Sequence, residues 1–135
     1  MSPTTFYKPY NRIANQFKPS LSCSQDSDKF SVANGNLTYP VALITIDEAS
    51  LAGGRTSNVN DQYYLYTGLT YWTMSPWDFN SNSGYAVVWR VRSEGELTNH
   101  AVTSTYGVRP VINLKSDVSI TQGTGTASNP YVLTY

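Results

Sequence analysis

Residues 85–92 read Tyr-Ala-Val-Val-Trp-Arg-Val-Arg, and this stretch decides the fold class of the 135-residue chain. Successive side chains of a β-strand point to opposite faces of the sheet. The odd-numbered residues, all aromatic or aliphatic, therefore share one face, while Arg90 and Arg92 face solvent on the other. Ser-Glu-Gly-Glu at 93–96 supplies a turn, and residues 97–102 return as a second strand. The pattern predicts an antiparallel hairpin with one buried face.

Further strands are predicted upstream of this hairpin. Residues 39–45 (Tyr-Pro-Val-Ala-Leu-Ile-Thr) form a mostly apolar run that indicates a buried strand. Residues 71–76 (Tyr-Trp-Thr-Met-Ser-Pro) indicate a core strand that Pro76 closes, because proline has no N–H to donate to a sheet. Residues 30–32 are a candidate short strand.

A short helix is predicted to begin at Thr45 and to run through Ala52. Thr45 and Glu48 have the spacing of a capping box, in which each side chain binds the backbone N–H of the other residue. Gly53-Gly54 then ends the helix. The position of Asp47 and Glu48 in the first helical turn explains these acids by interaction with the helix dipole, rather than by general acid–base chemistry.

The last third of the chain is predicted to be β-rich. Residues 108–114 (Val-Arg-Pro-Val-Ile-Asn-Leu) indicate a core strand, and Pro110 implies an irregular or edge segment in it. Residues 119–121 and 131–133 flank a Gly-, Thr- and Ser-rich turn, so the segment 115–135 is predicted to form a closing hairpin.

The whole chain, residues 1–135, is predicted to form one α+β domain of small twisted antiparallel sheets, one or two short helices and long ordered loops. Residues 1–30 mix prolines and aromatics without a clear period, and we expect an irregular or short helical segment whose aromatics pack on the domain. Asn36-Leu37-Thr38 fits an N-glycosylation acceptor.

The composition argues against two classes of partner. Nine basic residues balance nine acidic ones, and 13% of the chain is charged, so no basic stripe is present to bind nucleic acid. No run approaches the roughly 20 apolar residues of a membrane helix, so direct membrane insertion is not expected. Low charge with abundant Tyr, Ser, Thr and Asn is typical of surfaces that recognise ligands.

No catalytic or metal-binding constellation stands out in the sequence. Cys23 is the only cysteine, which excludes an internal disulfide and a cysteine-based zinc site. The only histidine, His100, lies far from it in the sequence. Asp78, Glu94 and Glu96 are too dispersed to predict a calcium site. We therefore predict no catalytic residues, no metal and no cofactor.

Three motifs follow one another in the second half of the chain: residues 71–76 (YWTMSP), 88–89 (VW) and 107–114 (GVRPVINL). Together they resemble a C-type-lectin-like module that is widespread in gut bacteria and their phages. Stretches at 43–54 and 125–132 are similar to the same module, so the resemblance covers roughly residues 30–135. The 107–110 motif is also similar to the formylglycine-generating-enzyme branch of this fold and to the variable proteins of diversity-generating retroelements.

The resemblance implies a C-type-lectin-like fold and a ligand surface between the fixed Trp, Gly and Arg positions. The chain departs from the enzymes, which use paired cysteines on copper, and from the calcium-dependent lectins, whose Glu-Pro-Asn or Gln-Pro-Asp and Trp-Asn-Asp triplets it lacks. The intervening positions are the candidate ligand-binding residues. They are Trp77, Asp78, Tyr85, Arg90, Arg92, Glu94, Glu96, His100, Thr103 and Tyr106.

Individual candidates keep a structural interpretation beside the functional one. Trp77 is either an exposed binding hot spot beside the 80–84 loop or a plug in the core beneath it. The charged residues at 90–96 either bind a ligand or form solvated ion pairs. His100 is interpreted as a neutral polar loop residue. Arg109 is interpreted as structural, binding loop carbonyls or pairing with a carboxylate.

Three functions are compatible with these observations. The first is a receptor- or adhesin-type display domain of a bacterial surface or phage protein, which binds a protein or glycan on a host or neighbouring cell. The second is a structural domain of a larger adhesin, and the third is an enzyme of the formylglycine-generating type, which the lone Cys23 disfavours. The first implies an extracellular, cell-surface or phage-particle location.

Overall fold

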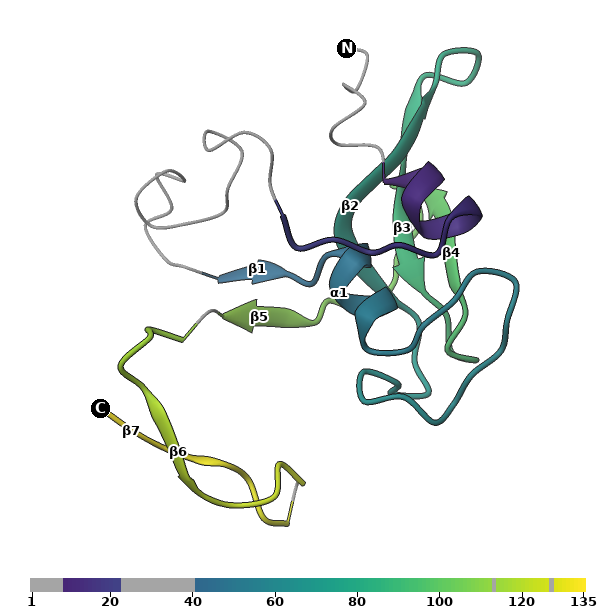
Figure 1. The fold of residues 1–135 in the computed structure, drawn as a ribbon. Helices are drawn as coiled ribbons and strands as arrows, with labels where there is room; N and C mark the ends of the chain where they lie inside the picture. Colours follow the sequence, from purple (N-terminus) through teal and green to yellow (C-terminus); the bar gives the residue numbers. More distant parts are fainter. Residues whose placement is uncertain (1–8, 23–40, 113, 127) are drawn as a thin grey trace.

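The computed structural model describes residues 9–22, 41–112, 114–126 and 128–135, which form an α+β fold of small antiparallel sheets and short helices (Figure 1). A π-helical turn and a short α-helix lie beside a three-stranded sheet, and two strand pairs complete the structure. The elements are η1 (Asn11–Asn15), β1 (Val41–Leu43), α1 (Ile46–Leu51), β2 (Tyr71–Asn80), β3 (Tyr85–Val91), β4 (Leu97–Ala101), β5 (Pro110–Ile112), β6 (Ser119–Gln122) and β7 (Val132–Thr134).

The central sheet has the order β2-β3-β4 and is antiparallel throughout. The β3–β4 hairpin predicted from residues 85–102 is confirmed, with Val91 opposite Leu97 and Val87 opposite Ala101. The turn between these strands contains Gly95 at φ 81°, where a Cβ would lie 1.7 Å from the backbone oxygen of Asn60. Glycine is therefore required there both by the backbone conformation and by the close approach of the 60-loop.

Burial alternates along the hairpin where it crosses the core. Trp89 is fully buried and Val91 and Leu97 are 1% exposed, whereas Arg90 between them is half-buried. The alternation weakens toward the start of β3, since Tyr85 and Val87 are half-buried rather than in the core. The prediction of one buried face is thus confirmed for the second half of β3 and wrong for the first half.

Strand β2 continues past Pro76 to Asn80, so the prediction that this proline closes the strand is wrong. Trp72 lies opposite Arg90 and Pro76 opposite Val88, so β2 contains extra residues between these two pairs. A second register shift follows before Asp78. The missing N–H of proline is accommodated by a bulged, irregular strand rather than by a strand end.

Helix α1 is fixed at its start by the predicted capping box. The Thr45 hydroxyl accepts from the Glu48 backbone N–H at 3.1 Å, and the Glu48 carboxylate accepts from the Thr45 N–H at 2.7 Å. The helix ends at Leu51 with Ala52 as its C-cap, one residue from the predicted end. Ile46 and Ala49 are fully buried and join Trp89 in the core.

The N-terminal segment is held on the domain by the burial of Ile13 and by an ion pair between Arg12 and Asp47. Ile13 of η1 is 1% exposed and belongs to the core. Arg12 donates two hydrogen bonds of 2.7 Å to the carboxylate of Asp47, which also accepts from the Ser20 backbone N–H at 2.9 Å. The structural interpretation of Asp47 is confirmed, and its partner is a segment far away in sequence rather than the helix dipole alone.

The expectation of a packed, short helical N-terminus is confirmed for residues 9–22, but the aromatics contribute less than expected. Ile13 occupies the core, whereas Phe17 is half exposed beneath the guanidinium of Arg55 and Tyr10 is 37% exposed. Several predictions concern residues outside the described ranges: the strand at 30–32, the glycosylation acceptor at Asn36, the first two residues of the 39–45 strand, and Cys23.

Strands β1 and β5 pair with each other and form a separate two-stranded sheet (Figure 1). The strands predicted within 39–45 and 108–114 form, but their burial is only partial. Val41 is 49% exposed and Ile112 is 62% exposed, whereas Ile44 is 4% exposed and Val111 packs against the core. Apolar runs of this length are also found in two-stranded ribbons, where only one side packs on the protein. The expectation that Pro110 lies in an edge segment is confirmed, because β5 has β1 as its partner on one side alone.

The C-terminal β6–β7 hairpin forms as predicted but does not close the domain. Figure 1 shows the hairpin apart from the rest of the fold, and every residue of both strands is exposed. Ile120 (58%), Val132 (45%) and Leu133 (42%) are among its exposed apolar residues. The Gly-, Thr- and Ser-rich turn between the two stretches predicted the pairing correctly, but the strands are not packed against the other residues that the structure describes.

Candidate functional site

The predicted ligand-binding residues lie in five different places on and around the β2-β3-β4 sheet. The face of this sheet that carries Trp89 is called the inner face, and the opposite face, which carries Arg90, is called the outer face. Arg90, His100 and Tyr106 gather on the outer face. Trp77 belongs to the inner face, and Arg92, Glu94 and Glu96 surround the β3–β4 turn. Asp78 and Tyr85 lie toward the far end of β2–β3, and Thr103 is exposed in the segment after β4.

The outer face holds a cluster of four residues, Trp72, Arg90, His100 and Tyr106, here called the outer-face cluster. Strand register explains the first three, because Trp72 lies opposite Arg90, and His100 lies opposite the neighbouring Val88. The ring of Tyr106 stands over them, with its centroid 4.9 Å from that of Trp72 and 5.6 Å from that of His100. The cluster is therefore built from all three strands and the segment that follows β4.

Backbone contacts fix the position of Tyr106. The Trp72 N–H donates to the Gly107 carbonyl at 3.0 Å, and the Gly107 N–H donates to the Thr70 carbonyl at 3.0 Å. Residues 106–107 are thereby attached to the edge of β2 as a short parallel bridge. The glycine of the 107–110 motif thus places the tyrosine beside it over the sheet.

Arg90 is the most unusual member of the cluster. Its guanidinium carbon lies 4.5 Å from the Tyr106 ring centroid, which is a cation–π distance. Its Nε is buried and has no hydrogen-bond acceptor among the described residues, and Arg90 forms no ion pair with any of them. The guanidinium therefore lies against the Tyr106 ring, and its charge is not paired with a carboxylate of the described residues.

His100 contributes a polar edge to the same cluster. Its Nδ1 lies 2.8 Å from the Ser104 hydroxyl, and its ring meets Tyr106 edge-on at an interplanar angle of 88°. The other ring nitrogen, Nε2, makes no hydrogen bond within the described residues. His100 is thus a strand residue of β4, whereas the sequence suggested a loop position.

Arg92 differs from Arg90 because its guanidinium is already occupied. It lies 3.0 Å from a carboxylate oxygen of Glu96 and 3.3 Å from one of Glu94. The pKa of Glu94 is lowered by a hydrogen bond from its own backbone, by the Ser93 hydroxyl and by the charge of Arg92. The interpretation of these three residues as partly solvated ion pairs at the turn is supported by this geometry.

The remaining candidates on the sheet do not join the outer-face cluster. The Asp78 carboxylate accepts from the Phe79 N–H at 2.8 Å. Tyr85 lies opposite Asn80 at the start of the β2–β3 turn. Thr103 is exposed.

Trp77 combines both interpretations offered by the sequence. Its ring packs edge-on against the buried Trp89 at 4.4 Å and against Tyr10 of the N-terminal segment at 4.6 Å. It is half-buried and packs against the core cluster, so it plugs the core. The same ring also forms one wall of a cavity of about 330 Å³.

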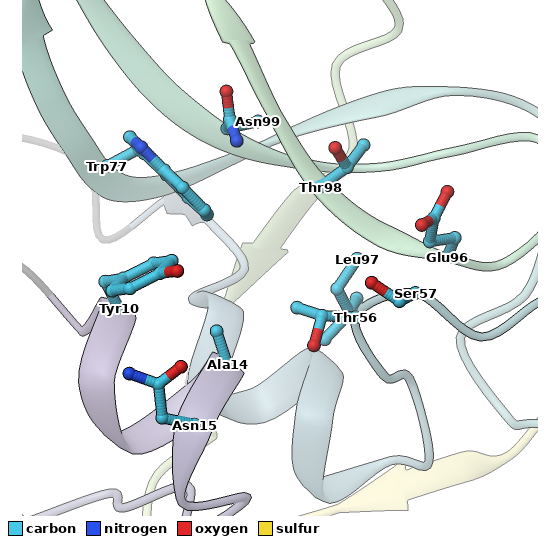
Figure 2. Close-up of a pocket in the computed structure, with 10 residues that line it drawn as sticks. All are labelled: Tyr10, Ala14, Asn15, Thr56, Ser57, Trp77, Glu96, Leu97, Thr98 and Asn99. Carbon is cyan, nitrogen blue, oxygen red and sulfur yellow. The ribbon is translucent and has the colours of Figure 1, made fainter.

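This cavity, here called the inner-face pocket, lies between η1, the turn at residues 56–57 and strand β4 (Figure 2). Trp77 and Tyr10 stand on one side, and the Thr56–Ser57 turn stands on the other. Figure 2 shows Leu97 and Asn99 on the side of β4 that faces Trp77, while Thr98 and Glu96 project from the other side. The lining residues are Tyr10, Ala14, Asn15, Thr56, Ser57, Trp77, Glu96, Leu97, Thr98 and Asn99.

Sequence reasoning identified two of these lining residues, Trp77 and Glu96, and missed the pocket itself. Asn99 could have been placed there by the alternation of β4, since it lies opposite Trp89 and two residues from Leu97. The contributions of Tyr10 and Asn15 depend on tertiary packing of the N-terminal segment, and that of Thr56 depends on how the 56–57 turn lies beside β4. No local pattern in the sequence predicts that packing.

The structural interpretation of Arg109 is confirmed. Its Nη1 donates to the Leu65 carbonyl at 2.7 Å, and the Tyr71 hydroxyl donates to the same carbonyl at 3.0 Å. Burial raises the pKa of the Tyr71 phenol and, more strongly, that of the Tyr63 phenol, while the Arg109 charge opposes both shifts. This group therefore connects the 63–69 loop to the core rather than facing a ligand.

The described ranges contain neither a cluster of metal-binding side chains nor a helix that could span a membrane. No three or more His, Cys, Asp or Glu side chains in that part of the chain gather as they would around a metal ion. No helix there has the length and apolar character needed to cross a membrane.

Comparison with protein families gave one match that covers most of the chain. Residues 23–116 match DUF6273, a domain of unknown function. This range contains the β2-β3-β4 sheet, the β1–β5 pair and the outer-face cluster, and it ends before β6. Comparison with curated proteins and with solved structures gave no match. The chain belongs to the DUF6273 family of domains of unknown function.

Proposed function

We propose that this chain is a ligand-binding display domain with a C-type-lectin-like fold, and that the outer-face cluster is its ligand surface. In this proposal the domain belongs to a bacterial surface or phage protein and acts outside the cell. Its ligand is a protein or glycan on a host or neighbouring cell. The relation to variable proteins of diversity-generating retroelements is part of the same proposal.

The observation that carries the proposal is the state of Arg90. A guanidinium over the Tyr106 ring, with a buried Nε and no acceptor among the described residues, leaves a strong donor unsatisfied. The buried Nε is out of reach of a ligand, but the terminal Nη groups, which also have no hydrogen-bond partner among the described residues, can donate to a ligand carboxylate, hydroxyl or carbonyl. Arginine and aromatic residues are also the side chains most enriched at binding hot spots.

The surroundings of the cluster support display rather than burial. Trp72, His100 and Tyr106 are each half-buried, so none of the three is enclosed in the core. They are held by strand register and by the Gly107 bridge, which limits their loss of entropy on binding. A preorganised aromatic and cationic surface on a rigid sheet is well suited to recognition.

A second candidate, a structural domain of a larger adhesin, is favoured by the β6–β7 hairpin. Its exposed apolar residues, Ile120, Val132 and Leu133 among them, would be covered if a neighbouring domain packed there. The two candidates make different use of the outer face, since a purely structural domain has no need of Arg90.

The proposal is tested by probing the domain on a glycan array and on an array of cell-surface proteins. Wild-type protein is compared with Arg90→Gln and with Tyr106→Leu, which remove the donor and the ring over it. Arg92→Gln, at a guanidinium already engaged by Glu94 and Glu96, is expected to reduce binding less than Arg90→Gln. Arg55→Gln controls for the loss of one positive charge away from the cluster.

We expect specific array signals for wild type and Arg55→Gln, and a loss of at least about tenfold for Arg90→Gln and Tyr106→Leu, as for other interface hot spots. Equal signals for wild type and all four variants would contradict the outer face as the ligand surface. Absence of any wild-type signal on both arrays would favour the structural-domain alternative.

A further inference from the structure

The inner-face pocket lies across the sheet from the outer-face cluster and is not explained by the proposed function. Its walls come from η1, the 56–57 turn, β2 and β4 (Figure 2). Its volume of about 330 Å³ lies at the small end of the roughly 300–1,000 Å³ typical of small-molecule sites. A cavity of this size suits one compact ligand rather than an extended chain.

The chemistry of the lining is polar and uncharged. The side chains that face the cavity include the amides of Asn15 and Asn99, the hydroxyls of Thr56 and Ser57, and the phenol of Tyr10. Amides and hydroxyls each offer both donors and acceptors. The lining contains no Lys or Arg, so the pocket is poorly suited to phosphate, sulfate or carboxylate groups.

The one charged lining residue, Glu96, is committed elsewhere. Its carboxylate binds Arg92 at 3.0 Å, and Figure 2 shows it projecting from the side of β4 away from Trp77. A cationic ligand would therefore meet no available carboxylate facing the cavity among the described residues. Anions and cations are both disfavoured, which leaves an uncharged ligand with many polar groups.

Trp77 and Tyr10 provide the apolar part of the wall. Their rings meet edge-on at 4.6 Å, and Trp77 is supported from behind by Trp89. Rigid aromatic rings beside amides and hydroxyls match a ring-shaped ligand that has C–H groups on its faces and hydroxyls on its rim. A pyranose has this combination, whereas a purely apolar ligand would leave the amides unpaired.

The backbone of the 56–57 turn gives an independent indication of a built site. Ser57 has φ 55°, in the left-handed region that non-glycine residues seldom occupy. Such conformations persist where the surrounding structure holds them, and they cluster at ligand sites. The Arg55–Asn58 bridge closes this turn and sets the Thr56 and Ser57 hydroxyls beside the cavity.

We infer that the inner-face pocket binds a single neutral pyranose unit, as a free saccharide or as the terminal residue of a glycan. Asn99 and Asn15 hydrogen-bond its hydroxyls from opposite sides, Ser57 and Thr56 contact its rim, and Trp77 contacts its apolar face. The site differs from the outer-face cluster and does not depend on it. Arg90 variants therefore leave saccharide binding in the pocket unchanged, and its affinity, on the order of millimolar, is too weak to account for the array signals that test the outer face.

The test is a titration of the isotope-labelled chain with methyl glycosides of glucose, galactose, mannose and N-acetylglucosamine, followed by nuclear magnetic resonance. At least one glycoside is expected to shift the side-chain amide signals of Asn15 and Asn99 and the indole N–H signal of Trp77. Dissociation constants on the order of millimolar are expected, as for ligands with so few atoms.

Variants distinguish glycoside binding in the pocket from binding elsewhere on the surface. Asn99→Leu, close in size, is expected to weaken the responsive glycoside by at least about tenfold, since a buried polar contact is lost. Ser57→Gly removes a hydroxyl while relieving the positive φ, so it is expected to fold at least as well as wild type and to bind several-fold more weakly. Asn82→Ala removes an exposed amide in the β2–β3 turn and is the matched control, with unchanged binding.

Three outcomes would overturn the inference. One is the absence of a shift at Asn15, Asn99 and Trp77 for every glycoside at concentrations far above the millimolar range. Another is a dissociation constant for the glycoside that is the same in Asn99→Leu and in Asn82→Ala. The third is a shift of the same signals on addition of a neutral peptide, N-acetylated tri-alanine amide, in a protein whose signals no glycoside shifts.

Discussion

The two faces of the β2-β3-β4 sheet are built from the same alternating strands and have opposite characters. On the inner face, Trp89, Val91 and Leu97 are at most 1% exposed and form the centre of the core with Ile13 and Ile46. On the outer face, the neighbouring residues keep their rings and charges partly in solvent. One sheet thus separates the residues that stabilise the fold from those available for recognition.

The comparison also explains why two arginines on the same strand face differ. Arg92 lies beside the turn, where Glu94 and Glu96 neutralise it. Arg90 lies two residues deeper, where the neighbours across the strands are Trp72 and Thr98. Position along one strand therefore decides which guanidinium is paired with carboxylates and which has no ion pair among the described residues.

The largest expected loss of stability follows a substitution on the inner face. Trp89→Ala should destabilise the domain by about 3–5 kcal/mol, because it empties a fully buried site beside Trp77. Val88→Ala, one residue away and half-buried, should cost about 1 kcal/mol. Chemical denaturation measures both. Similar losses for the two variants would show that the faces are not energetically distinct.

The contact that holds η1 over the inner face should have the next largest effect. Asp47→Asn removes the charge from a carboxylate that binds Arg12 twice and the Ser20 N–H once, and should cost about 2 kcal/mol. Asp61→Asn, at an exposed carboxylate, should change the unfolding free energy by less than about 0.5 kcal/mol. Hydrogen exchange of η1 amides should rise in Asp47→Asn alone; an unchanged rate would contradict the role assigned to this ion pair.

Some elements of the fold could be predicted from the sequence alone, and others could not. The capping box at Thr45 and Glu48, the β3–β4 hairpin and the β6–β7 pairing follow from local spacing, and local spacing predicted them. The continuation of β2 past Pro76 and the exposure of β1 and β5 depend on which strands become neighbours. Local periodicity carries no information on that choice.

The candidate site shows the same limit. The alternation at 85–92 predicted Arg90 on the outer face, but the contact of its guanidinium with Tyr106 requires the Gly107 bridge to β2. The inner-face pocket requires η1 to cross the sheet, which depends on a pairing between Arg12 and Asp47 across 35 residues. Contacts at such separations are set by tertiary packing.

A smaller effect is expected from Tyr63, buried beside the core, and it depends on pH. Its hydroxyl has no hydrogen-bond partner among the described residues, and burial raises its pKa above the ordinary 10.0. The folded state thus holds the neutral phenol, and the unfolded state releases the proton from about pH 10 upward. The contribution of Tyr63 to the unfolding free energy should be constant below this pH and fall above it.

Tyr63→Phe should reduce that alkaline loss and be neutral or slightly stabilising at pH 7, because no hydrogen bond is removed. Urea denaturation at pH 7 and between pH 10 and 11 provides the measurement. Tyr64→Phe, at an exposed phenol of the same loop, is the matched control. An alkaline loss that is identical in wild type and Tyr63→Phe would contradict the assignment.

The smallest effect on stability is expected from removing the β6–β7 hairpin, which belongs to neither face of the sheet. The β6–β7 hairpin is exposed along both strands and lies beyond the range that matches the family. Deletion of residues 117–135 should leave the melting temperature within about 2 °C of the full chain, since few contacts are lost. A much lower melting temperature would mean that the hairpin packs on the sheet in solution.

The most direct test of the division between faces is to measure binding and stability together for two adjacent substitutions, Trp89→Phe and Arg90→Gln. Array binding is read on the glycan and cell-surface-protein arrays, and the unfolding free energy is determined on the same preparations. Trp89→Phe should lose about 1–2 kcal/mol of stability and keep its array signal. Arg90→Gln should keep its stability within about 0.5 kcal/mol and lose at least about tenfold in signal. Loss of binding in proportion to stability for both variants, or full binding by Arg90→Gln, would contradict the account.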